Sequence, residues 1–95
     1  MQDTVVKFGK PYSFEGKEYT EVDLKGYESF TTQDLIEINA QWKAAKGNAL
    51  LPEFDLQWNC FAAARATKLP VEFFLGLPSK EGKKVCNIGI TFFQE

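Results

Sequence analysis

Histidine is absent from this chain of 95 residues, and serine occurs only at positions 13, 29 and 79. Histidine is the commonest general base and the usual partner of a catalytic serine. No serine lies in a Gly-x-Ser-x-Gly motif, and the isolated glycines do not form a phosphate-binding loop. These absences predict that the protein is not an enzyme.

Cysteine is scarce as well. Cys60 and Cys86 are far apart in the sequence, and without histidine the chain has no zinc-binding spacing. We expect both to be small buried apolar residues in a reducing compartment, with no metal and no cofactor. Glu18, Glu21 and Asp23 could supply a carboxylate pair, but they fall on a predicted strand whose outward face suits solvated charges.

Long apolar runs are also missing. No segment approaches the roughly 20 apolar residues that span a bilayer, and residues 1–4 lack the basic and apolar regions of a signal peptide. The net charge is −2, and neither half of the chain carries a basic excess. We therefore expect a cytoplasmic protein that binds neither membranes nor nucleic acid.

Two features bear on DNA binding. Residues 63–74 look superficially like a helix-turn-helix motif, but the second helix would present an acidic residue and two phenylalanines, which do not read base edges. Lys80, Lys83 and Lys84 form a basic cluster. This cluster is interpreted as a solvated face, with phosphate contact as the alternative.

The first part of the chain predicts a β-hairpin over about residues 5–24. Its turn lies at Glu15-Gly16-Lys17, where Gly16 can adopt a positive φ. In the second strand Thr20, Val22 and Leu24 are expected on the packed face, because side chains alternate along a strand.

Helices are predicted after the hairpin. Thr31 and Asp34 form a capping box that starts a helix over about residues 32–46. Asp55 can cap a second helix over about 55–67. Pro70 suits the first turn of a short helix over about 70–75.

The last element is ambiguous from local pattern. Residues 85–93 alternate between apolar and polar, which favours a strand. A helix over about 79–93 is the alternative, but it would contain Gly82 and Gly89, each about 1 kcal/mol worse than alanine.

Aromatic residues are abundant, at 15 % of a chain with little interior. Each one, Trp42 included, is expected more often in the core than on a surface. The adjacent pairs Phe73-Phe74 and Phe92-Phe93 differ, because two neighbours cannot both point inward unless their element is covered on more than one side. One member of each pair is therefore a candidate contact for a partner or for self-association.

Several short motifs follow one another in a defined order over about residues 8–93. They are the hairpin motif Pro11–Val22, the helix start Phe30–Leu35, the alanine-rich helix and turn Ala62–Pro70, and the endings Leu77-Pro78 and Phe92-Phe93. In this order they resemble the tail assembly chaperones of Mu-like phages and prophages. That family ends in a helix, so the resemblance shifts the expected final element from strand to helix.

The resemblance implies an α+β domain over residues 1–95, with a hairpin followed by three to four short helices. It also implies a holdase that binds the tape measure protein during tail assembly in the bacterial cytoplasm and is absent from the mature virion. The expected partner surface comprises Phe73, Phe74, Phe92, Phe93 and Trp42, and self-association is a second expected use of it. The alternatives are a small phage DNA-binding regulator or another protein-interaction domain.

Overall fold

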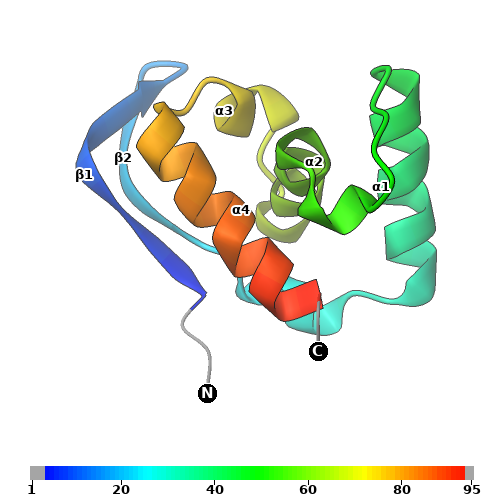
Figure 1. Cartoon of the computed structure of the whole chain (residues 1–95). Helices are drawn as coiled ribbons and strands as arrows, with labels where there is room; N and C mark the ends of the chain where they lie inside the picture. The colour runs from blue at the N-terminus through cyan, green and yellow to red at the C-terminus, as the bar shows by residue number, and fades with distance from the viewer. Residues whose placement is uncertain (1–3, 94–95) are drawn as a thin grey trace.

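A β-hairpin opens the fold, and helices make up most of the rest of residues 4–93, the range that the computed structural model describes (Figure 1). Within this range the elements, with η marking a 3-10 helix, are β1 (Val5–Phe14), β2 (Lys17–Asp23), η1 (Lys25–Ser29), α1 (Thr32–Ala44), η2 (Pro52–Phe54), α2 (Leu56–Thr67), α3 (Val71–Leu75) and α4 (Ser79–Phe93). The predicted α+β class, a hairpin followed by helices, is confirmed.

The boundaries agree closely with those predicted from the sequence, and the largest difference among the helices is the earlier end of α1. Of the expected domain over residues 1–95, residues 1–3 and 94–95 lie outside the described range. Across residues 4–93, no helix combines the length and the apolar character needed to cross a membrane.

The hairpin closes in a tight turn at Glu15 and Gly16, as predicted. Both residues have positive φ, 51° and 79°, and the strands pair on either side of them, at Phe14 and Lys17. Two successive positive φ values give a turn whose twist matches that of the flanking strands. The turn therefore sets the register at the tip of the hairpin.

The pairing register shifts within residues 7–12 of β1. Such an irregularity bends a strand and increases its twist. Val22 is buried as expected, but Thr20 is exposed. Tyr19 packs instead, with its ring centroid 4.8 Å from that of Phe73. The predicted alternation is wrong at Thr20 and Tyr19, because the shift changes which side of the hairpin packs.

Helix α1 begins with the predicted capping box. Thr31 Oγ1 accepts a hydrogen bond from Asp34 N at 3.3 Å, and the Asp34 carboxylate accepts one from Thr31 N at 2.7 Å. The helix ends at Ala44. A Cβ on the following Gly47 would lie 2.2 Å from Trp42 Nε1. The chain thus leaves the helix by passing directly over the Trp42 ring.

Helix α2 lies in the middle of the fold and contacts α1, α3 and α4 (Figure 1). Asp55 caps it as predicted, and its carboxylate accepts hydrogen bonds from Trp58 N at 3.0 Å and Trp42 Nε1 at 2.9 Å. Ala62 and Ala63 are fully buried. Because the side chains at a contact set the distance between helices, these alanines allow close approach.

Residues 79–93 form a helix, so the strand favoured by local alternation is wrong. The buried positions recur at helical spacing, at Glu81, Val85, Cys86 and Gly89. A Cβ on Gly89 would lie 2.0 Å from Asn59 Oδ1 of α2. The glycine that lowers local helix propensity is therefore needed where α4 crosses α2.

The carboxylate of Glu81 connects α4 to the irregular part of β1. Gly9 N donates a hydrogen bond to Glu81 Oε2 at 2.7 Å. Lys84 Nζ lies 3.0 Å from Glu81 Oε1 and donates to Lys7 O at 3.2 Å. The hydrogen bond from Gly9, helped by Lys84, holds the pKa of Glu81 below its ordinary value. The start of α4 is thus fixed to the bend in the hairpin.

The two glycines of α4 should respond oppositely to alanine. In Gly89→Ala the new methyl group meets Asn59, which cannot swing away without losing its hydrogen bonds to Glu53 O and Asp55 O. We expect this variant to lose about 1–3 kcal/mol of unfolding free energy. Gly82→Ala meets nothing within 4 Å and should gain about 1 kcal/mol from helix propensity. Urea denaturation measures both, and a stabilising Gly89→Ala would contradict the packing role.

Glu81 should make the fold more sensitive to acid. Because its pKa is lowered in the folded state, its stabilising effect is complete above the unfolded glutamate pKa of about 4.3 and is lost as the pH falls below it. Glu81→Gln should lower stability at neutral pH and flatten the decline between about pH 5 and pH 3. Glu72→Gln, at an exposed position, is the control. Denaturation at each pH measures the stability of each variant. A decline that is as steep in Glu81→Gln as in the wild type would argue against this contact.

Candidate functional site

Several large apolar side chains are exposed in the segment of residues 50–56, here called the apolar loop. Leu50 is 99 % exposed, and Leu51, Phe54 and Leu56 are exposed as well. Single exposed apolar residues are common on protein surfaces, whereas a cluster in one short segment marks a contact surface.

An open groove of about 390 Å³, here called the apolar groove, adjoins this loop, and Leu56 belongs to both. Its walls come from the first turn of α2, the end of α3 and the first turns of α4. Phe74 and Leu77 are almost completely buried and form its floor, whereas Leu56 and Leu75 are exposed and form its rim. A groove of this kind accepts apolar side chains from the face of a partner helix.

The cysteine beside the groove is poorly suited to covalent chemistry. Burial raises the pKa of the Cys60 thiol to about 11, so the thiol is protonated at neutral pH. Cys86 of α4 is buried, and burial raises its pKa too. Both cysteines are free thiols, but only Cys86 has the burial that the sequence predicts for both, because Cys60 is half-buried. The groove therefore presents shape and apolar surface to a ligand rather than a reactive group.

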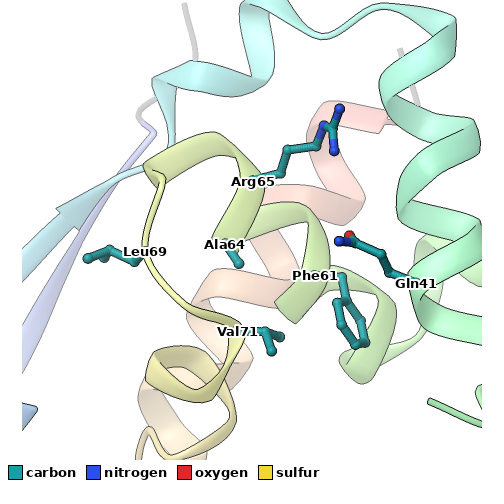
Figure 2. Close-up of a pocket in the computed structure, with 6 residues that line it drawn as sticks. All are labelled: Gln41, Phe61, Ala64, Arg65, Leu69 and Val71. Carbon is teal, nitrogen blue, oxygen red and sulfur yellow. The ribbon is translucent and has the colours of Figure 1, made fainter. Parts of the chain in front are cut away.

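A second hollow, of about 240 Å³, lies between α1 and α2 (Figure 2). Figure 2 shows Gln41 of α1 close to Phe61 of α2, with Val71 beside them. Arg65 extends from α2 in the direction away from Phe61, and Leu69 lies on the far side of the hollow. This second hollow thus lies where α1 packs against α2.

Arg65 already forms two ion pairs beside the second hollow. Its Nε lies 2.8 Å from Asp34 Oδ1, and its Nη2 pairs with Glu37. The backbone hydrogen bond from Thr31, followed by the contact with Arg65, lowers the pKa of Asp34. Hydrogen bonds from Gln33 and then Arg65 lower the pKa of Glu37. Arg65, Asp34 and Glu37 join α1 to α2 and so serve the packing of the fold. The apolar groove, whose rim is exposed, is therefore the better candidate for a binding site.

The expectation that one ring of the Phe73-Phe74 pair is exposed is wrong. Phe73 is 0 % exposed and Phe74 is 2 % exposed. Phe73 faces the hairpin, where the ring centroids of Tyr12 and Tyr19 lie 5.1 and 4.8 Å away. Phe74 lines the apolar groove next to α2 and α4. Both rings are buried because α3 is covered on two sides.

The other predicted site residues lie elsewhere. Phe92 and Phe93 are both half-buried, so neither is singled out as exposed, and their ring centroids lie 5.5 and 5.0 Å from that of Tyr27. Trp42 is 2 % exposed and donates its indole hydrogen bond to Asp55. The structure therefore does not bring the five predicted residues together, and only Phe74 among them lines the groove.

The sequence predicts helices over about 32–46 and 55–67 with only a connecting loop between them, and so misses the main exposed leucines. A usable signal was present, because Leu50, Leu51 and Phe54 surround a proline and fit neither a helical nor a strand period. Leu75 offers no such signal. Its exposure depends on how neighbouring elements cover α3.

Within residues 4–93, no group of three or more Cys, Asp or Glu side chains is placed to hold a metal ion. Comparisons of the chain with protein-family models, with curated proteins and with solved structures found no match. What the protein binds must therefore follow from the chemistry of its own surface.

Alanine substitution should separate core rings from surface leucines. Phe73→Ala removes a fully buried ring and should cost about 3–5 kcal/mol of unfolding free energy. Leu50→Ala removes a fully exposed side chain and should change stability by less than about 0.5 kcal/mol. Thermal unfolding measures both variants. A large loss in Leu50→Ala would mean that the loop is packed and is not a free contact surface.

Proposed function

We propose that this protein is a tail assembly chaperone of a phage or prophage, which binds the tape measure protein and keeps it soluble during tail assembly. The observation that carries the proposal is the apolar loop together with the apolar groove beside it. The order of sequence motifs, which resembles that of the Mu-like chaperones, suggests the partner. The chaperone acts in the cytoplasm of the host and is absent from the mature virion.

A chaperone of this kind has to hold long apolar helices without locking them in place. Recognition of a helix in a groove uses apolar anchors spaced by one helical turn. The groove offers room for such an anchor above Phe74, and Leu50 adds an exposed contact nearby in the chain. Burying about 100 Å² of apolar surface is worth about 2.5 kcal/mol. Such a contact is easily released, yet many copies along one partner chain act together.

The proposed contact surface differs from the one expected from sequence. Phe73 and Trp42 support the core, and Phe92 and Phe93 pack around Tyr27. The surface instead consists of the apolar loop and the groove rim, with Phe74 contributing from below. Self-association would use the same exposed leucines.

A DNA-binding regulator fits the geometry of α2 and α3 less well. Helix α3 has five residues, and its two phenylalanines are buried. Glu72 and Leu75 are its exposed residues, and neither donates hydrogen bonds to base edges. We therefore propose protein binding and not duplex recognition.

Co-expression with the tape measure protein tests the proposal. The gene for that protein is expected beside the gene for this chain. The wild-type chain should raise the soluble fraction of the tape measure protein and co-purify with it. Leu56→Ser/Leu75→Ser should lose most of this effect, because both side chains form the exposed rim of the groove. Ile36→Ser removes a similarly exposed apolar side chain from α1 and is the control.

Circular dichroism of the purified variants confirms that each is folded. A wild-type chain that neither solubilises nor co-purifies with the tape measure protein would contradict the proposed function. An equal loss in Ile36→Ser and in the rim variant would place binding outside the groove.

A further inference from the structure

The rim of the apolar groove carries one lysine that forms no ion pair among the described residues. Lys83 lines the groove and is exposed, whereas Lys80 lines a different hollow, between α4 and β1, together with Glu81. Among the described residues, Lys84 forms an ion pair with Glu81, whereas Lys80 and Lys83 form none. The groove therefore has one ammonium group at its rim, that of Lys83, in a chain whose net charge is −2.

The direction of α4 adds to this charge. Ser79, the first residue of this 15-residue helix, lines the same groove, so the positive end of the helix dipole lies there. The acidic groups close in sequence do not line the groove. Glu81 accepts its hydrogen bond from β1, and Asp55 accepts one from the Trp42 indole. The groove is thus apolar and carries positive charge on one side, at Lys83 and the start of α4.

We propose that the groove binds an amphipathic helix whose apolar anchors are flanked by acidic side chains, with Lys83 pairing with one of those acids. The inference rests on the proposed function and names the chemistry of the partner segment. The anchors supply most of the affinity, because exposed ion pairs contribute little in water. Lys83 discriminates between segments, since a basic flank at the same place is repelled.

Fluorescence anisotropy with synthetic peptides tests this selectivity on the full chain. The first probe is an amphipathic peptide of roughly 16 residues with leucines at i, i+3, i+4 and i+7 and two flanking glutamates. A second probe carries lysines in place of the glutamates, and a third carries serines in place of the leucines. At low salt the glutamate probe should bind about fivefold more tightly than the lysine probe. The difference should vanish near about 0.5 M salt, and the serine probe should not bind.

Two charge-reversal variants show whether the preference for the glutamate probe arises at the groove. Lys83→Glu should abolish or invert the preference for the glutamate probe, because the charge at the groove rim changes sign. Lys25→Glu makes the same change at an exposed position of η1, away from the groove, and should keep the preference.

Equal affinity for the glutamate and lysine probes would overturn the inference while leaving apolar binding in the groove intact. An equal effect of both reversals would show that net charge alone decides, and it would overturn the inference as well. No binding of any leucine-containing probe would also overturn it. In each case co-expression with the tape measure protein reports independently on the proposed function.

Discussion

Helix α2 is approached closely from several sides, and a small residue makes each approach possible. Ala62 and Ala63 are fully buried at its centre. Where α4 crosses, Gly89 leaves room for Asn59, and where η1 passes, a Cβ on Gly26 would lie 2.3 Å from a backbone oxygen of α2. The helix can therefore be covered on most of its surface (Figure 1). A larger side chain at any of these contacts would push an element outward.

The apolar groove follows from this arrangement. Helix α4 is held against α2 near Gly89, while its start is held against the bend of β1 by Glu81. The two helices are thus fixed at different points, and the five-residue α3 lies beside the start of α4 (Figure 1). A space lined by Phe74 and Leu77 is left between the starts of α2 and α4. The same contacts that stabilise the fold also shape the candidate binding site.

The features that could be predicted from sequence are those that a few neighbouring residues decide. The turn at Gly16 and the capping box at Thr31–Asp34 are of this kind, and both are confirmed. Gly89 lowers the local helix propensity, so the sequence disfavoured a helix at the end of the chain. The contact that requires a glycine at this position comes from α2, which is distant in the sequence. The burial of Phe73 and the exposure of Leu75 likewise depend on elements distant in the chain. Of the candidate site, local pattern alone therefore identified little beyond Phe74.

The central claim is that the apolar loop and the apolar groove form one binding surface. Amide chemical shifts of the isotope-labelled chain, recorded with and without a soluble helical fragment of the tape measure protein, test it most directly. Shift changes are expected to be concentrated in residues 50–57 and 74–83, with the strands of the hairpin unaffected. Changes confined to the hairpin or to α1, or no changes at all, would contradict it.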